Sequence, residues 1–185
     1  MKKHIPNILT VLRLVLTVVI IICFIVPFSG NFLWIFGFFV VAVLTDYFDG
    51  MLARRWKVES TFGKVFDSLI DKILVLSILM MLIPYNIVHY GIFVAFLFRD
   101  IFVDGLKNYL LSLNKPVAPK ITGKLKFFFQ TLMIGLMLLL LSDTRWDGEE
   151  VLYMLGILTT TSLALFFAYF SAFLYTRDFI RSYKS

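Results

Sequence analysis

Long apolar runs separated by short polar segments dominate the chain. Six of these runs reach about 20 residues, the length that an α-helix needs to cross a bilayer, and they cover residues 5–26, 32–53, 62–83, 87–112, 122–141 and 151–175. The segments between them are about ten residues or shorter, which leaves no room for a second domain. The pattern predicts an all-α integral membrane protein with six transmembrane helices, in which residues 1–185 form a single domain.

The composition excludes a water-soluble globule. Apolar residues make up 60% of the 185 residues and charged residues only 16%, with a mean hydropathy of +0.89. Soluble domains are about 45–50% apolar and about 25% charged, and a chain this short could not bury the excess. A soluble enzyme, a disordered tail and a nucleic-acid module are therefore excluded. The single cysteine, Cys23, lies in an apolar run, so neither a disulfide framework nor a cysteine metal site is expected.

The distribution of lysine and arginine predicts the orientation. With the N-terminus inside, the outer loops carry only Arg145, whereas the inner side carries Lys2, Lys3, Arg54, Arg55, Lys57, Lys64, Lys115, Lys120, Lys124, Lys126, Arg177, Arg181 and Lys184. Basic residues in short loops mark the cytosolic side. We therefore expect a protein of the cell (cytoplasmic) membrane with both termini in the cytosol.

Ionisable side chains interrupt five of the six apolar runs. They are Arg13, Asp46, Asp49, Asp67, Asp71, Lys72, Arg99, Asp100, Asp104, Lys107, Lys124 and Lys126. Such a residue in a membrane costs several kcal/mol unless it is paired or faces a cavity. At 1.5 Å per residue, Asp46 lies roughly 8–10 Å and Asp71 roughly 12–14 Å from the cytosolic ends of their helices. We expect the helices to surround one polar cavity that faces the cytosol.

Four aspartates have spacings that suit a metal site. Asp46 and Asp49 are three residues apart and Asp67 and Asp71 are four apart, so each pair lies on one helical face. Four carboxylates at low dielectric repel one another unless cations neutralise them. Oxygen ligands without His or Cys favour Mg²⁺ or Mn²⁺, and two such ions would balance four charges.

Small residues and one arginine accompany the aspartates. Gly50 and Ala53 extend the aspartate face of the second run, and Gly63 lies one turn before Asp67, so a bulky ligand could approach the backbone. Arg54 could reach a phosphate at the same mouth. Phosphoryl transfer is suited by such a site, in which carboxylates, two metal ions and an arginine surround the space for a ligand.

Residues 46–71 read Asp-x-x-Asp-Gly-x-x-Ala-Arg, eight further residues, then Gly-x-x-x-Asp-x-x-x-Asp. This stretch resembles the signature of the CDP-alcohol phosphatidyltransferase family, with the same gap. The resemblance implies transfer of a phosphatidyl or related phosphoester group from a CDP-linked donor to an alcohol, with release of CMP and a need for divalent metal ions. It also implies six helices, and family members are commonly homodimers.

The resemblance assigns roles to individual residues. It implies metal binding by Asp46, Asp49, Asp67 and Asp71, with Asp71 as the general base. For nucleotide binding it implies Asn7, Thr10, Asp46, Gly50, Ala53, Arg54 and Gly63.

Outside the signature the chain is similar to the phosphatidylglycerophosphate synthase branch of that family. The matching blocks are Ile5-Pro6-Asn7-x-Leu9-Thr10-x-x-Arg13, Arg99-Asp100-x-x-Val103-Asp104-Gly105-Leu106-Lys107 and Gly123-Lys124-x-Lys126-x-x-x-Gln130. The chain departs from the branch at Ser68, Lys120 and Phe127. This similarity implies CDP-diacylglycerol as the donor and glycerol 3-phosphate as the acceptor. We expect the acceptor phosphate to be bound by Arg99, Lys120, Lys124 and Lys126.

Other interpretations of these residues remain open. The aspartates could form a buried ion-pair network with Lys72 and Arg99 that only sets the helix register, and the basic residues could extend to lipid headgroups. Within the family, a cardiolipin synthase or a phosphatidylinositol-phosphate synthase would share the signature. A cation transporter also uses intramembrane carboxylates, although transporters usually bind near the midplane and contain repeats.

Overall fold

The computed structural model describes residues 5–26, 28–56, 61–113, 120–142 and 150–184, with side chains except at 5–8, 47–50, 52–56, 61–66, 150 and 182–184. The described residues form a short 3₁₀ helix (Ile83–Tyr85) and six α-helices, which are α1 (Ile5–Ile25), α2 (Asn31–Trp56), α3 (Thr61–Leu82), α4 (Tyr90–Ser112), α5 (Ile121–Ser142) and α6 (Glu150–Lys184). The expectation of an all-α chain is confirmed for these residues.

Local backbone features explain where the helices begin. Gly30 has a φ of +74°, the left-handed conformation that glycine adopts without strain, and α2 begins at the next residue. Asn86 is also left-handed, with a φ of 59°, and ends the 3₁₀ helix. The His89 side chain then accepts a hydrogen bond from the Gly91 amide and caps α4. Because of this turn, α4 begins at Tyr90 and not at the predicted residue 87.

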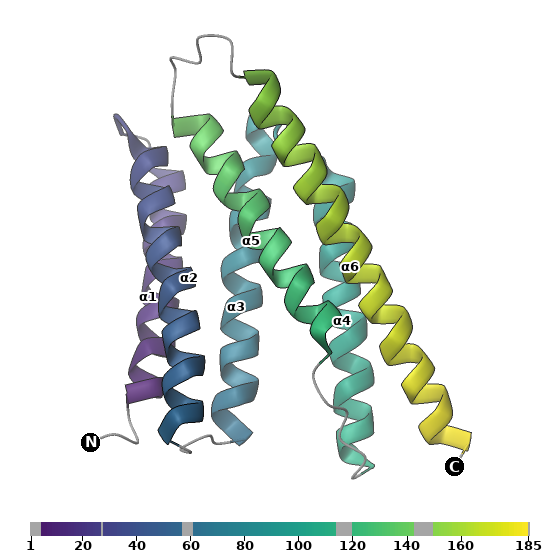
Figure 1. Cartoon of the computed structure of the whole chain (residues 1–185). Helices are drawn as coiled ribbons and strands as arrows, with labels where there is room; N and C mark the ends of the chain where they lie inside the picture. Colours follow the sequence, from purple (N-terminus) through teal and green to yellow (C-terminus); the bar gives the residue numbers. More distant parts are fainter. Residues whose placement is uncertain (1–4, 27, 57–60, 114–119, 143–149, 185) are drawn as a thin grey trace.

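The helices pack as two groups that share an apolar core. Helix α1 packs against α2 and α3, α6 packs against α4 and α5, and α2 meets α5 between the groups. Figure 1 shows that α1 begins and α6 ends at the same end of the molecule, and that the two groups diverge toward that end. The core fills the opposite half, with Ile20, Phe39, Leu79, Phe96 and Met133 among its buried residues. Charged residues of the described helices such as Asp71, Arg99 and Lys126 lie in the diverging half.

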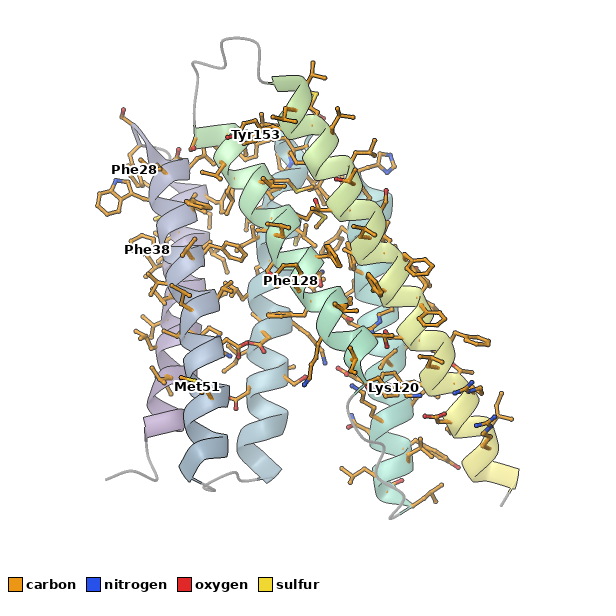
Figure 2. All side chains as sticks on the ribbon, in the orientation of Figure 1. Phe28, Phe38, Met51, Lys120, Phe128 and Tyr153 are labelled. Carbon is orange, nitrogen blue, oxygen red and sulfur yellow. The ribbon has the colours of Figure 1, made fainter. Side chains whose placement is uncertain are left out.

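The outer surface is suited to lipid. Many of the side chains drawn in Figure 2 are apolar and point outward from the helices, and on α6 Leu152, Phe166 and Phe173 are each at least 60% exposed. Three segments are long and apolar enough to cross a membrane, namely Asp67–Tyr85, Ile121–Ser142 and Val151–Arg181. Leu9–Ile25 and Asn31–Asp46 are shorter apolar helices. These features are those of a membrane protein.

Two helices differ from the simple apolar pattern. Helix α4 is not among the three long apolar segments, since it carries Arg99, Asp100, Asp104 and Lys107. Helix α6 continues to Lys184, although the apolar pattern predicts its end at residue 175. The additional turns contain Arg177, Asp178 and Arg181, so they extend the helix beyond its apolar part.

Candidate active site

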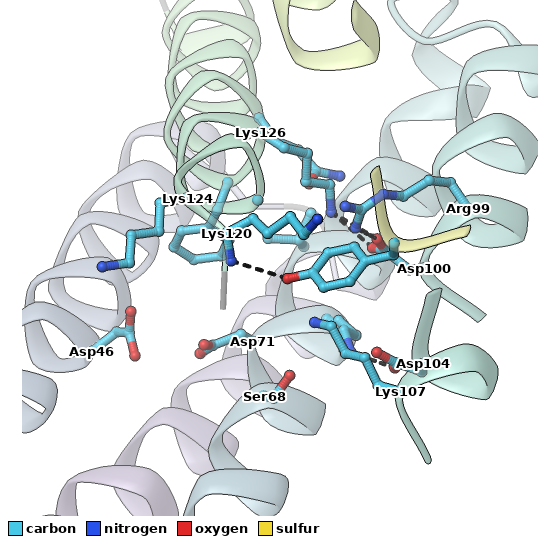
Figure 3. Close-up of a pocket in the computed structure, with 16 residues that line it drawn as sticks. Asp46, Ser68, Asp71, Arg99, Asp100, Asp104, Lys107, Lys120, Lys124 and Lys126 are labelled. Carbon is cyan, nitrogen blue, oxygen red and sulfur yellow. Dashed lines mark hydrogen bonds and ion pairs between the residues drawn. The ribbon is translucent and has the colours of Figure 1, made fainter. Parts of the chain in front are cut away.

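A polar cavity of about 300 Å³ opens between the two helix groups, in the half where they diverge. Among the described residues that line it are four carboxylates, Asp46, Asp71, Asp100 and Asp104, and six cations, Lys72, Arg99, Lys107, Lys120, Lys124 and Lys126. Figure 3 shows Asp46 and Asp71 at one side and Arg99, Asp100 and Lys126 at the other. The cavity therefore has a carboxylate wall, formed by α2 and α3, and a wall rich in cations, formed by α4 and α5.

Arg13 joins the carboxylate wall to α1. Its side chain is completely buried, its Nη2 lies 3.0 Å from Asp46 Oδ1, and its Nη1 donates to Asp71 Oδ1 at 2.5 Å. One guanidinium thus contacts the first and the last aspartate of the signature. The interpretation that Arg13 extends to lipid headgroups is wrong, because its charge is used inside the protein.

Thr10 provides a second link from α1 to the signature. Its hydroxyl donates a hydrogen bond to Asp67 Oδ1. Thr10 and Arg13 are three residues apart and lie on one face of α1. That face holds both Asp67 and Asp71 of α3, so the opening block of the sequence and the aspartate signature form one structural unit.

Several predicted site residues have side chains outside the described part of the chain. These are Asn7, Asp49, Gly50, Ala53, Arg54 and Gly63. The backbone of each belongs to α1, α2 or α3. Their assignments remain predictions.

The chemistry of the carboxylate wall fits a divalent cation. Asp46, Asp67 and Asp71 offer oxygen ligands only, as Mg²⁺ and Mn²⁺ prefer, and Arg13 carries one positive charge against their three negative charges. Among the described side chains, no three His, Cys, Asp or Glu lie close enough together to hold a metal ion. Because the side chain of Asp49 is not among these, the two-metal site remains a prediction.

A second cluster of charges is buried in the opposite wall. Asp100, which is only 3% exposed, accepts from Arg99 Nη1 at 2.7 Å and from Lys126 Nζ at 2.8 and 3.0 Å. Arg99 also donates to the Ala168 carbonyl at 3.0 Å and to the Ser171 hydroxyl. Two cations share one carboxylate here, so a positive charge is left to attract an anion from the cavity.

The pairing in the structure decides between two interpretations of the sequence. Lys72 pairs with Asp104, which joins α3 to α4, and Arg99 pairs with Asp100. The interpretation that Lys72 and Arg99 pair with the signature aspartates is therefore wrong for Asp46, Asp67 and Asp71, whose side chains the structure describes. Arg99 therefore has a carboxylate partner in Asp100 of its own helix, and its assignment to the acceptor phosphate remains a prediction.

The remaining predicted acceptor residues lie at the start of α5. Lys120 Nζ lies 2.5 Å from Asp178 Oδ2 and donates to the Leu174 carbonyl at 3.1 Å. In Figure 3 the Lys124 ammonium points toward Asp46 on the same side of the cavity, and no ion pair of Lys124 is found among the described residues. Four predicted acceptor residues, Arg99, Lys120, Lys124 and Lys126, thus line one cavity.

Helix α6 contributes polar residues that the sequence interpretation missed. Ser171 accepts from Arg99, Asp178 pairs with Lys120, and the Tyr175 hydroxyl accepts from the Lys120 amide at 3.1 Å. The Tyr175 ring lies 4.6 Å below the Lys107 ammonium and is 3% exposed. The spacing of Ser171, Tyr175 and Asp178 places them on one face of the helix, and that signal was present in the sequence.

Comparison with known proteins gives consistent results. The family model described as CDP-alcohol phosphatidyltransferase matches residues 3–174. A protein of Rickettsia typhi is 34% identical over 157 residues, which cover 82% of this chain and 83% of that protein. A protein of Salmonella choleraesuis is 30% identical over 171 residues, covering 88% and 92% respectively.

A third relative, from Mycoplasma pneumoniae, is 29% identical over 150 residues, which cover 79% of this chain and 66% of that protein. All three relatives carry the name CDP-diacylglycerol--glycerol-3-phosphate 3-phosphatidyltransferase. The family model covers most of the chain, including both walls of the cavity. The chain belongs to the CDP-alcohol phosphatidyltransferase family.

Proposed function

We propose that this protein transfers the phosphatidyl group of CDP-diacylglycerol to sn-glycerol 3-phosphate, forming phosphatidylglycerophosphate and CMP in phospholipid biosynthesis. The observation that carries the proposal is the cavity itself, in which signature aspartates face a wall rich in cations. The relatives' name states this donor and this acceptor. Family membership favours a transferase over the cation transporter that the sequence left open.

The carboxylate wall is the donor side of the proposed site. Two Mg²⁺ or Mn²⁺ ions held by Asp46, Asp49, Asp67 and Asp71 would neutralise the pyrophosphate and the departing CMP when bound. The nucleotide would contact Asn7, Thr10, Asp46, Gly50, Ala53, Arg54 and Gly63. The hydrogen bond from Thr10 to Asp67 supports this grouping, because it holds the start of α1 beside the signature.

Asp71 is the general base in this proposal. Its carboxylate takes the proton from the primary hydroxyl of glycerol 3-phosphate, and the hydroxyl oxygen forms a bond to the phosphorus that carries diacylglycerol. The bond between that phosphorus and the CMP oxygen breaks, and CMP leaves with the electron pair. Asp71 is suited to this role because it lines the cavity while Arg13 fixes its orientation.

The cation-rich wall is the acceptor side. A dianionic phosphate requires several charged donors, and Arg99, Lys120, Lys124 and Lys126 supply them from α4 and α5. Asp100 holds Arg99 and Lys126 in place without cancelling their combined charge. A neutral alcohol such as glycerol would not require this arrangement.

The proposal includes the cellular location and the membrane topology of the protein. All six helices cross the cytoplasmic membrane, both termini lie in the cytosol, and the cavity faces the cytosol, where glycerol 3-phosphate is dissolved. The shared end of α1 and α6 in Figure 1 supports termini on one side, and the basic residues at that end support the cytosolic side. A homodimer is part of the same prediction.

Purified protein in detergent or in vesicles without an ion gradient tests the function. Labelled CDP-diacylglycerol is mixed with glycerol 3-phosphate, phosphatidylglycerol, inositol phosphate or glycerol, and CMP and lipid products are measured. We expect CMP and phosphatidylglycerophosphate with glycerol 3-phosphate only. A better yield with phosphatidylglycerol would support a cardiolipin synthase, and no CMP with any acceptor would contradict a transferase.

A further inference from the structure

Gln130 on α5 is a buried amide without a hydrogen-bond partner in the part of the chain that the structure describes. Its side chain is 0% exposed to bulk solvent yet lines the cavity, and neither its Oε1 nor its Nε2 has a hydrogen bond to the described residues. Buried polar side chains nearly always have a partner, because an unpaired one loses its hydrogen bonds to water without replacement. An unpaired amide in the wall of a polar cavity therefore indicates a ligand group that reaches it.

The position of Gln130 identifies the part of the cavity that this ligand group occupies. Gln130 lies four residues after Lys126, one helical turn further along the same face of α5. Lys126 belongs to the buried cluster with Arg99 and Asp100. Asp71 lines the same cavity from α3. The amide therefore borders the space that a small acceptor fills when it extends from the cations to Asp71.

The chemistry of an amide limits which group it can recognise. A glutamine offers one acceptor oxygen and two N–H donors, and it carries no charge. A hydroxyl group, which both donates and accepts, is its complement, whereas the cations Arg99 and Lys126 suit a phosphate. A ligand with a neutral hydroxyl next to a phosphate would satisfy both the amide and these cations.

We propose that Gln130 binds the secondary hydroxyl of glycerol 3-phosphate and so selects the acceptor. This inference rests on the proposed function. The three polar groups of the acceptor then have separate partners, since the phosphate contacts Arg99 and Lys126, the secondary hydroxyl contacts Gln130, and the primary hydroxyl faces Asp71. A site built to bind a hydroxyl discriminates strongly against a substrate that lacks it.

The test compares two acceptors that differ only in that hydroxyl. Glycerol 3-phosphate and 3-hydroxypropyl phosphate share the phosphate and the reacting primary hydroxyl. We expect the unmodified protein to favour glycerol 3-phosphate at least about 10-fold in kcat/KM, because one buried amide loses its partner with the analogue. Equal use of the two acceptors would overturn the proposal even if no variant could be purified.

The variant Gln130→Met separates recognition from structure. Methionine has a similar length and volume but forms no comparable hydrogen bond. We expect kcat/KM for glycerol 3-phosphate to fall at least about 10-fold, and kcat/KM for 3-hydroxypropyl phosphate to stay within about twofold. An equal fall with both acceptors would indicate a structural role or a bound water and would overturn the proposal.

A neighbouring residue provides the matched control. The Thr131 hydroxyl donates to the Phe127 and Phe128 carbonyls of its own helix, so Thr131→Val removes a polar group from the same turn of α5. The preference for glycerol 3-phosphate should be unchanged in that variant. If the unmodified protein releases CMP with neither acceptor, the proposed function fails, which is distinct from equal use of both acceptors.

Discussion

Arg13 is the side chain on which carboxylates of two helices converge. Its buried guanidinium contacts Asp46 on α2 and Asp71 on α3, and it thereby offsets the repulsion between these two carboxylates. The planar fork of an arginine can serve two carboxylates in fixed directions, whereas a lysine is a point charge on a flexible chain. Arg13 therefore orients the carboxylates of the donor wall.

The role of Asp71 can be tested by Asp71→Asn. We expect kcat to fall at least ~10²-fold, the scale of a lost general base, with a much smaller change in KM for CDP-diacylglycerol. Initial rates with both substrates varied separately would measure this. Asparagine also removes one charge partner of Arg13. The unfolding temperature of the variant should therefore be measured, and the assay run well below that temperature. A kcat near that of the unmodified protein would contradict the assignment.

Lys124 offers a clean test of acceptor binding. It has no ion pair among the described residues, so Lys124→Ala removes a cation from the cavity without breaking a known contact. A charge-assisted hydrogen bond contributes about 1.5–3 kcal/mol, so KM for glycerol 3-phosphate should rise roughly 10- to 150-fold, with KM for the donor unchanged.

Arg99→Ala is a useful comparison for Lys124→Ala. We expect it to raise the same KM but also to weaken the packing of α4 on α6, since Arg99 contacts Ala168 and Ser171. A rise in KM that both variants share reports acceptor binding, whereas a fall in stability seen only with Arg99→Ala reports the lost packing of α4 on α6. If neither variant changed KM for glycerol 3-phosphate, Lys124 and Arg99 would not be acceptor ligands.

At the scale of elements, buried polar contacts determine how α4, α5 and α6 are assembled. Asp100 of α4 binds Lys126 of α5, and Arg99 of α4 binds α6. Helices in a membrane gain little from apolar burial against each other, because lipid is equally apolar, so such polar contacts determine which faces meet. The Lys72–Asp104 pair plays the same part between α3 and α4.

Asp100→Asn tests this second cluster. The change leaves Arg99 and Lys126 buried without a counter-charge, and breaking a buried pair in this way costs about 3–5 kcal/mol. The thermal unfolding temperature should fall clearly. In the double variant Asp100→Asn/Lys126→Met the fall should be smaller, because one unpaired charge is gone. Equal losses in the single and double variants would show that the charge pair does not stabilise the assembly.

At the scale of the whole molecule, the chain has an apolar half and a polar half. The shared core holds the two helix groups together at one end, and the groups diverge around the cavity at the other (Figure 1). Each group supplies one wall, so a donor at α2 and α3 and an acceptor at α4 and α5 would meet between them. In the proposed function the carboxylate wall holds the metal ions and the donor, and the cation-rich wall holds the acceptor phosphate.

Metal removal tests the carboxylate wall as part of the whole protein. We expect an excess of chelator to abolish activity and to lower the unfolding temperature, since a ligand that binds only the folded state stabilises it by mass action. Added Mg²⁺ or Mn²⁺ should restore both. Full activity in excess chelator would be incompatible with metal binding at these aspartates. Thermal unfolding gives a measure that does not depend on turnover.

Much of this protein is determined by local sequence. The apolar runs predicted all six helices, and their limits were within one residue except at the end of α2, the start of α4 and the end of α6. Helix length and periodicity depend on neighbouring residues, which a single sequence shows directly. The aspartate signature is likewise local, because its residues lie within two adjacent helices.

Only the tertiary structure decided which charges pair. Arg13 reaches carboxylates more than 30 residues away, and Asp100 meets Lys126 from another helix. Such contacts depend on the rotation and depth of each helix relative to its neighbours, which the period of one helix does not specify. The unpaired amide of Gln130 is of the same kind, since it becomes visible only when neighbouring helices exclude solvent from it. The sequence by itself determined the helices and the reacting groups, and packing decided which of those groups share a wall.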